Sequence, residues 1–375
     1  MRNRRQMAVA AIVLWGILSA SKAAQPAAGA ETAPDAIALA QLDGFALGLT
    51  EADQFSGVVL VARDGRILFE KAYGKLDAEK DALATVETRY NLASAGKMFT
   101  TVAILQQIAA GKLTLDTKVG AVLKDYPNGA FAETVTIRHL LTHIAGAGEI
   151  ALYGEENEAN RAHVRSVADM IALRDRWPPD FAPGSKQDYS NYGFVVLGRI
   201  VEILSGETYE AYVQRHIFEP AGMTKTGFVD CTDRAPDLAV GYAIVAGKRQ
   251  SNCLTQPRRG FPAGGQVSTA ADMYRFVRAL QTGKLMPPAL FAEATRTHRE
   301  YMGLGFFATD YGPDIPARDF RWGHGGSTDG ACTDVRDYPR TGETIVVLTN
   351  RDPPACFPVA NFLHEQWTRR PANMR

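Results

Sequence analysis

Strand-like segments lie at both ends of this 375-residue chain, with a long helical stretch between them. Near the start, Val58–Ala62 and Ile67–Tyr73 are rich in β-branched and aromatic residues. They flank Asp64-Gly65, a pair that tolerates the positive φ angles of a type I′ hairpin turn. Near the end, residues 329–338 and 344–348 show the same strand character. Because strands from both termini can pair in one sheet that helices cover, the pattern predicts an α+β fold with an antiparallel sheet.

Helical periodicity marks most of the chain between the two sets of strands. Apolar residues recur at helical spacing in residues 34–49, 98–110, 195–204, 273–280 and 355–367. Gly111 and Gly206 follow two of these segments, at positions typical of helix C-termini. We predict a sheet region at about 38–90 and 262–368, and a mostly helical insertion at about 95–260. A cleft between two such regions is the usual place for a small ligand.

The N-terminus has the layout of a secretory signal peptide. Three arginines among the first five residues precede an apolar run from Met7 to Ala20. This run of 14 residues is shorter than the roughly 20 that a membrane span requires. We expect a signal peptide at 1–23, with cleavage as late as residue 30, and a flexible leader at 24–35. The protein would then be periplasmic or secreted, without an integral membrane segment; an uncleaved anchor is the alternative.

Four cysteines remain in the mature chain, and four cysteines allow three pairings. Cys231 and Cys253, and also Cys332 and Cys356, are nearest neighbours in the sequence. In an oxidising compartment each such bond would close a short loop and add about 3 kcal/mol of stability. Four buried thiols are the alternative. No two cysteines have the C-x-x-C spacing of a zinc site.

The composition argues against several classes of partner. Lysines and arginines number 41 and acidic residues 41, so no basic field attracts nucleic acid or a membrane surface. His139 and His143 have an i, i+4 spacing that could hold a metal, but no third ligand with matching spacing is near. We therefore expect no metal, no cofactor and no nucleic-acid partner.

Ser94 and Lys97 form an S-x-x-K motif where a loop enters the 98–110 helix. Positions i and i+3 share a helix face, so the Lys97 amine can approach the Ser94 hydroxyl. A serine hydroxyl becomes a good nucleophile when a base removes its proton, and a buried, partly neutral lysine can be that base. Alone the motif is weak, because Ser19–Lys22 matches it inside the signal segment.

A second motif, Tyr189-Ser190-Asn191, opens the next helical segment. A tyrosine held near a lysine ammonium can have a lowered pKa and act as a general base. The Asn191 amide offers a donor and an acceptor to substrate. A helix-entry turn with a packed tyrosine is the alternative interpretation.

A third motif, His324-Gly325-Gly326-Ser327, precedes a strand pattern. Its two glycines allow a strand edge to approach a substrate closely. The Ser327 N–H could then pair with that of Ser94 as an oxyanion hole. A glycine turn between two strands is the alternative.

In this order the three motifs resemble the active-site motifs of the serine β-lactamase and penicillin-binding-protein superfamily. The tyrosine of the second motif is similar to that of the class C β-lactamase branch, which includes D,D-peptidases, esterases and D-aminopeptidases. Leu140-Leu141-Thr142-His143 and Ala263-Gly264-Gly265, followed by Ser268-Thr269, look like further segments of this family. The likeness runs from about residue 38 to 368, and we expect a β-lactamase/transpeptidase-like catalytic domain at 36–370.

The resemblance implies a role for each motif residue. Ser94 would be the nucleophile, Lys97 the group that keeps it deprotonated, and Tyr189 the base and then the acid toward the leaving group. The N–H groups of Ser94 and Ser327 would form the oxyanion hole. Three residues would contact the substrate: Asn191, His324 and Gly326. The reaction would pass through an acyl-enzyme and need no metal or cofactor.

His324 departs from the family pattern, because many penicillin-recognising members carry a lysine there. Near pH 7 a histidine is largely neutral unless a neighbour raises its pKa. We therefore expect an exported serine hydrolase of a small ester, amide or peptide: an esterase, D,D-peptidase or amidase with weak β-lactamase activity at best. The alternatives are a non-catalytic exported binding protein of the same fold and a true class C-like β-lactamase.

Overall fold

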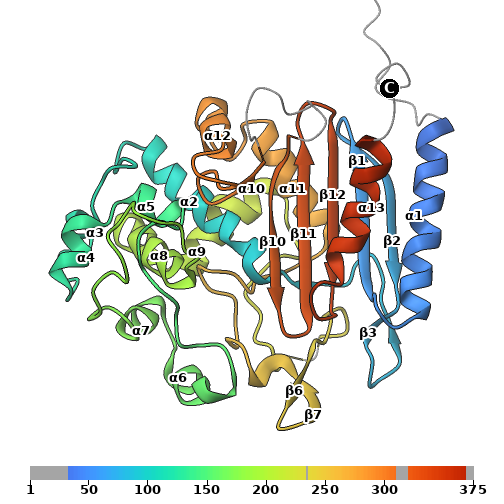
Figure 1. Ribbon diagram of the computed structural model, residues 1–375, viewed down its shortest axis with the longest axis horizontal. Helices are drawn as coiled ribbons and strands as arrows, with labels where there is room; N and C mark the ends of the chain where they lie inside the picture. Colours follow the sequence, from blue (N-terminus) through green and yellow to red (C-terminus); the bar gives the residue numbers. More distant parts are fainter. Residues whose placement is uncertain (1–32, 234, 310–319, 369–375) are drawn as a thin grey trace, which may run out of the picture. The chain divides into compact units, whose positions relative to one another are not determined.

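A six-stranded antiparallel sheet takes its strands from both ends of the chain (Figure 1). In the order β2-β1-β12-β11-β10-β9, the N-terminal hairpin lies beside the C-terminal strands. The strands are β1 (Gly57–Arg63), β2 (Arg66–Tyr73), β9 (Phe307–Ala308), β10 (Trp322–Thr328), β11 (Ala331–Tyr338) and β12 (Glu343–Thr349). The computed structural model describes residues 33–233, 235–309 and 320–368, so the predicted signal peptide and most of the predicted leader lie outside the described residues. The α+β fold with an antiparallel sheet is confirmed.

The hairpin turn between β1 and β2 has the predicted backbone. Asp64 and Gly65 have φ angles of 49° and 85°. Positive φ at both central residues is what a type I′ turn requires, and Asp-Gly adopts it at little cost.

Strand β1 contributes to two hydrophobic cores, because successive residues of a strand point to opposite faces of the sheet. Val59 and Val61 pack with residues of α1 (Ala33–Glu51) and α13 (Cys356–Thr368). Val58 and Leu60 belong to the larger core, which extends into the helical region. Burial on both faces explains why the strand is an unbroken apolar run rather than an alternating one.

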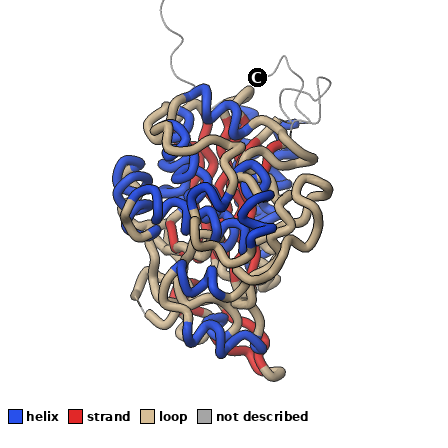
Figure 2. Tube along the Cα trace, turned by 90° about the vertical axis from the view of Figure 1, so that its left-hand side faces the viewer, coloured by secondary structure: helices blue, strands red, loops and turns tan. Residues whose placement is uncertain are grey.

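The helical region packs against the sheet on the side away from α1 and α13 (Figures 1 and 2). Its α-helices are α2 (Lys97–Ala109), α3 (Val119–Val122), α4 (Gly129–Thr134), α5 (Ile137–Leu141), α6 (Glu158–His163), α7 (Val167–Ala172), α8 (Asn191–Ser205), α9 (Tyr209–Val213) and α10 (Glu219–Ala221). Helices α11 (Ala270–Gln281) and α12 (Pro288–Thr295) follow. Of the 13 residues of α2, 10 are buried, so other elements cover this helix on nearly all sides.

Short elements complete the helical region and correct one prediction. Residues 242–251, expected within the helical insertion, form a hairpin of β6 (Tyr242–Val245) and β7 (Lys248–Ser251). Its second strand is polar, so no apolar alternation marks it in the sequence. The remaining short elements are β3 (Lys75–Asp77), β4 (Ala82–Leu83), β5 (Tyr90–Asn91), β8 (Val267–Ser268), η1 (Ala93–Gly96), η2 (Glu155–Asn157), η3 (Gln214–Phe218) and η4 (Asn252–Leu254).

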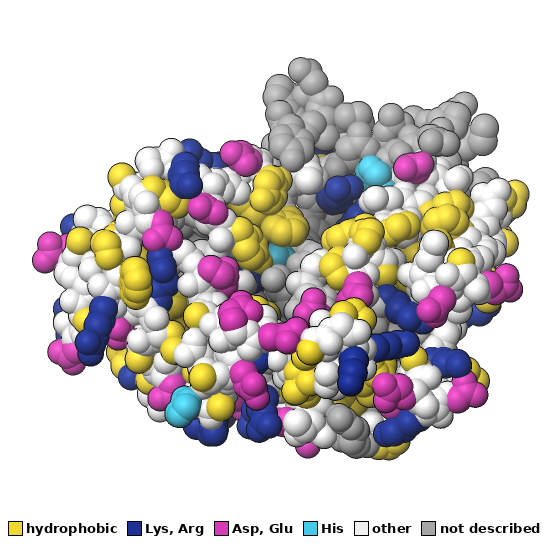
Figure 3. All heavy atoms as spheres, turned by 60° about the horizontal axis from the view of Figure 1, so that its bottom comes forward, with side chains coloured by type: hydrophobic (Ala, Val, Ile, Leu, Met, Phe, Trp, Pro, Cys, Tyr) yellow, Lys and Arg dark blue, Asp and Glu magenta, His cyan; other side chains and the backbone are white. Residues whose placement is uncertain are grey.

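Two disulfides join the cysteines that are nearest in the sequence. Cys231 bonds to Cys253, with a Cα–Cα distance of 5.6 Å, and Cys332 bonds to Cys356, at 5.4 Å. The second bond ties the start of β11 to the start of α13. None of the helices in the described residues combines the length and apolar character that a membrane span requires. On the face drawn in Figure 3, acidic and basic side chains are interspersed.

Candidate active site

Ser94 lies in η1, the short 3₁₀ helix that runs directly into α2. The residue before it, Ala93, has a φ of 44°, which is unusual for a residue with a side chain. Two contacts hold this conformation: Ala93 N–H donates to Asn91 Oδ1 at 2.7 Å, and Ala93 O accepts from Gly265 N–H at 3.0 Å. A Cβ at Gly264 would lie 2.1 Å from Ala93 O, so only glycine fits beside the turn that presents Ser94.

Lys97 is fully buried one turn after Ser94, and its Nζ has three partners. Nζ lies 3.2 Å from Ser94 Oγ, 2.5 Å from Asn191 Oδ1 and 2.7 Å from the carbonyl oxygen of Ala263. The last two oxygens can only accept hydrogen bonds, whereas the serine hydroxyl can also donate. This set suits a neutral amine, because two N–H bonds would satisfy the two acceptors and leave the lone pair of the nitrogen for the proton of Ser94.

Burial lowers the pKa of Lys97 to about 7, although the negative charge of Glu149 raises it in part. A lysine with this pKa is neutral in a large fraction of molecules near pH 7. The sequence prediction that Lys97 can serve as a base for Ser94 therefore has a physical cause in its surroundings.

Tyr189 precedes α8 and lies in the same cavity as Ser94. Its ring stacks on His143 with centroids 4.2 Å apart, and the Lys97 Nζ lies 4.8 Å from the ring centre rather than at the hydroxyl. Burial raises the pKa of Tyr189, and the neighbouring Ser94 hydroxyl offsets this only in part. The expected lowering of this pKa is wrong, because burial outweighs any effect of the lysine. Near neutral pH the Tyr189 hydroxyl is thus a proton donor, and Lys97 is the better base.

Two residues without an assigned role in the sequence support the second motif. Glu149 Oε1 accepts a hydrogen bond from Asn191 Nδ2 at 2.8 Å, which turns Asn191 Oδ1 toward Lys97. His143 Nδ1 accepts from the Ser190 N–H at 3.1 Å, which orients the ring that stacks on Tyr189. His143 was recognisable from its Leu-Leu-Thr-His segment, whereas no pattern in the sequence marks Glu149.

His324 lies on β10, is 1% exposed and stacks on Phe307 with centroids 4.1 Å apart. Its Nδ1 lies 2.5 Å from the carbonyl oxygen of Gly325, so Nδ1 carries the proton in this contact. Burial, together with the positive charge of Lys97, lowers the pKa of His324 to about 3. The third motif therefore presents a neutral ring, as the sequence predicted.

Gly326 brings β10 against the turn that carries the nucleophile. A Cβ at this position would lie 2.3 Å from Leu92 O and 2.9 Å from the backbone nitrogen of Ser94. The next residue, Ser327, follows on the same strand and lines the same cavity as Ser94. Because β10 lies so close to the Ser94 turn, Ser94 and Ser327, whose backbone N–H groups would form the predicted oxyanion hole, line the same end of the cavity.

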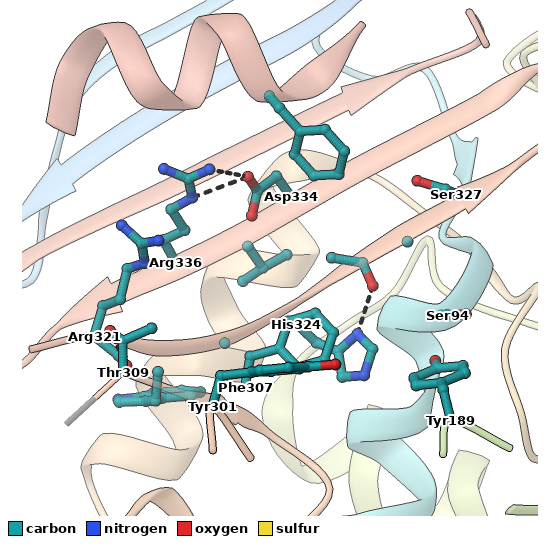
Figure 4. Close-up of a pocket in the computed structure, with 16 residues that line it drawn as sticks. Ser94, Tyr189, Tyr301, Phe307, Thr309, Arg321, His324, Ser327, Asp334 and Arg336 are labelled. Carbon is teal, nitrogen blue, oxygen red and sulfur yellow. Dashed lines mark hydrogen bonds and ion pairs between the residues drawn. The ribbon is translucent and has the colours of Figure 1, made fainter. Parts of the chain in front are cut away.

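The cavity has a volume of about 570 Å³, within the usual range for small-molecule sites. Figure 4 shows Ser94 and Tyr189 at one end, His324 and Phe307 in the middle, and Arg321 and Arg336 at the other end. Its wall comes from η1, the segment before α8, β9, β10, β11 and the start of α13. Sequence reasoning placed Ser94, Tyr189 and the third motif here, but not the aromatic and arginine residues.

The two histidines considered for a metal serve other roles. His139 Nδ1 accepts from the Thr136 N–H at 3.4 Å in the N-terminal cap of α5, and His143 supports the second motif as described. In residues 33–233, 235–309 and 320–368, no three His, Cys, Asp or Glu side chains converge as metal ligands would.

A serine next to a buried lysine, together with a tyrosine and a glycine-rich strand of an antiparallel sheet, is typical of serine hydrolases that act through an acyl-enzyme. Residues 42–366 match the family model described as Beta-lactamase. The chain is 32% identical over 307 residues to esterase EstB of Burkholderia gladioli, covering 72% of this chain and 77% of that protein. The penicillin-binding protein of Bacillus halodurans superposes with a TM-score of 0.73 at 27% identity, covering 85% of this chain and 98% of that one.

A D-stereospecific amidohydrolase from Streptomyces sp. shares the fold with a TM-score of 0.68 at 25% identity, covering 83% of this chain and 94% of that one. The chain belongs to the beta-lactamase family. It is a serine hydrolase of this family, which unites proteins named as penicillin-binding proteins, esterases and amidohydrolases.

Proposed function

We propose that this protein is an exported hydrolase that cleaves a small ester or amide through an acyl-enzyme on Ser94, with weak β-lactamase activity at best. The observation that carries the proposal is the buried Lys97 amine, 3.2 Å from Ser94 Oγ and with a pKa of about 7. It supplies a base at neutral pH directly behind Ser94, which lines a cavity that a small substrate fits.

In the proposed reaction, the neutral amine of Lys97 takes the Ser94 proton while Ser94 Oγ attacks the substrate carbonyl. The N–H groups of Ser94 and Ser327 stabilise the negative charge on the carbonyl oxygen. The Tyr189 hydroxyl gives a proton to the leaving oxygen or nitrogen as its bond to carbon breaks, and Lys97 returns a proton to Tyr189. Water then attacks the acyl-enzyme and transfers a proton to the neutral Lys97. As the bond between the acyl carbon and Ser94 Oγ breaks, Lys97 returns that proton to Ser94 Oγ, and the carboxylic acid is released with both side chains restored.

Weak action on penicillins follows from His324. A penicillin carries a carboxylate one carbon from the scissile nitrogen, and a fixed positive charge near the nucleophile would attract it. The neutral ring of His324, whose pKa is about 3, supplies no such charge. Esters and amides that lack such a carboxylate do not need a positive charge at this position, so a neutral His324 does not weaken their binding.

Export is supported by the two disulfides, since such bonds persist in oxidising compartments. The predicted signal peptide agrees with this placement.

Intact-protein mass spectrometry after incubation with a fluorophosphonate, and separately with a penicillin, tests the proposal in wild type and Ser94→Ala. We expect a fluorophosphonate adduct in wild type alone, and little penicillin adduct or penicillin loss. A stable, Ser94-dependent penicillin adduct would instead indicate a penicillin-binding peptidase, and rapid penicillin consumption a β-lactamase. No adduct with either reagent would contradict an active nucleophile.

A further inference from the structure

The cavity that holds Ser94 continues past His324 to a second, charged end. Arg321, just before β10, and Arg336, on β11, line this end together with Asp334. Figure 4 shows the two arginine side chains beside each other, across His324 from Ser94 and Tyr189. The reaction as proposed above uses none of these three side chains.

The charges at this end do not balance. Arg336 and Asp334 are paired at 2.5 Å and are 8% and 5% exposed. The carboxylate accepts hydrogen bonds from Nε and Nη2 of Arg336, and the Tyr338 hydroxyl lies close enough to the guanidinium to help raise the pKa of Arg336. Arg321 makes no ion pair in the part of the chain that the structure describes. Among the described residues that line this end, two guanidinium groups thus face one carboxylate, and an anionic group of a ligand would balance the second positive charge.

Glycines and aromatic residues line the cavity between the two ends. Gly323 and Gly325 flank His324 and add no side chains to this stretch of β10. Three aromatic residues line the path: Tyr301, Phe307 and Phe357. Phe307 packs edge-on against Tyr301, with centroids 5.6 Å apart. An aromatic or extended aliphatic group would fit along this wall.

The strand register sets the length of that group. Gly326 lies against the Ser94 turn, and Arg336 pairs with Gly323, three residues earlier on β10. At about 3.3 Å per residue, the backbone of Arg336 is on the order of 10 Å along the sheet from the Ser94 turn, which sets the scale of the spacer.

We propose that the arginine end binds a carboxylate of the substrate, carried about 10 Å from the scissile carbonyl by an apolar spacer. The inference rests on the proposed function, because it names the class of ester or amide that this site accepts. An anionic oxygen would form a charge-assisted hydrogen bond with Arg321 beside the Arg336–Asp334 ion pair. The carboxylate of a penicillin is too close to its scissile bond to reach this position.

Matched ester pairs test the proposal. The first pair is the butyrate ester of 3-(4-hydroxyphenyl)propanoic acid and the same compound as its methyl ester, with the charge on the leaving group. The second pair is monophenyl suberate and its methyl ester, with the charge on the acyl group. For each variant the measured quantity is the ratio of kcat/KM for the acid to that for its methyl ester.

In wild type we expect a ratio of at least about 10 in one pair, the size of one charge-assisted hydrogen bond. Arg321→Gln should bring that ratio close to 1. Arg340→Gln, at an exposed arginine outside the cavity, is the matched control and should leave the ratio unchanged. The ratio of kcat/KM for the acid to that for its methyl ester should also fall as the salt concentration is raised, because salt screens the attraction between the carboxylate and the arginines.

Equal rates for acid and methyl ester in both pairs, or a preference that survives Arg321→Gln, would overturn the inference. Ser94-dependent cleavage of the methyl esters would in that case still support the proposed function. If none of the four esters is cleaved in a Ser94-dependent way and no fluorophosphonate adduct forms, both the carboxylate site and the proposed function are contradicted.

Discussion

The pKa of Lys97 provides the most direct quantitative prediction. With a pKa of about 7, the neutral fraction is half at pH 7, whereas an exposed lysine at 10.5 would be neutral in roughly one molecule in 3,000. If the neutral amine is the base, kcat/KM for a neutral ester should rise about 50-fold from pH 5 to pH 7 and level off above it. Hydrolysis of 4-nitrophenyl butyrate, corrected for the spontaneous reaction, measures this profile.

Glu149 allows the assignment to be checked. Its charge raises the pKa of Lys97, so Glu149→Gln should move the midpoint of the profile to lower pH while keeping an acceptor for Asn191. Glu158→Gln, an exposed carboxylate at the start of α6, is the matched control and should not move it. A profile that stays flat between pH 5 and 7 in wild type would refute Lys97 as the base.

The same pKa predicts a stability effect whose sign can be worked out. Folding lowers the pKa of Lys97 from 10.5 to about 7, so the unfolded chain binds more protons between these values and stability rises with pH there. Relative to Lys97→Met, which cannot titrate, wild type should gain about 2 kcal/mol of unfolding free energy between pH 7 and pH 9. Urea unfolding at the two pH values measures the difference, and an equal change in both proteins would show that Lys97 is charged in the folded state.

Three further predictions concern packing, covalent bonds and specificity. Gly326→Ala would place a Cβ 2.3 Å from Leu92 O, so we expect a loss of about 2 kcal/mol of stability and at least a 100-fold lower kcat/KM. Thermal melts and ester assays measure the two effects. Gly129→Ala, at a glycine with open space around it, is the control and should change neither quantity. Replacing Cys332 and Cys356 together by alanine should cost about 3 kcal/mol in equilibrium unfolding, and retention of wild-type stability would contradict the role of this bond. His324→Lys should raise the rate of Ser94 acylation by a penicillin, measured by stopped-flow or mass spectrometry. An unchanged rate would contradict the proposal that the lack of positive charge at this position makes penicillin a poor substrate.

Local patterns in the sequence were enough to predict the main elements. The turn at Asp64-Gly65 and the helix ends at Gly111 and Gly206 all adopt positive φ as predicted. The spacing of Ser94 and Lys97 places them together, because positions three apart on a helix are neighbours. The β6–β7 hairpin was missed, since its polar second strand has no apolar alternation to reveal it.

The chemistry of these residues was decided by tertiary structure. Lys97 is buried by Asn191 and Ala263, which lie 94 and 166 residues further along the chain. The same packing raises the pKa of Tyr189, against the sequence prediction, and lowers that of His324.

Periodicity, turn residues and motif spacing act over a few residues, so they locate the helices, strands and reactive side chains along the chain. They did not determine which side chains share the cavity, such as Arg321 and Arg336 with Ser94. The shared cavity and the charge state of each group depend on long-range packing, because burial and nearby charges come from segments that meet only when the whole chain has folded.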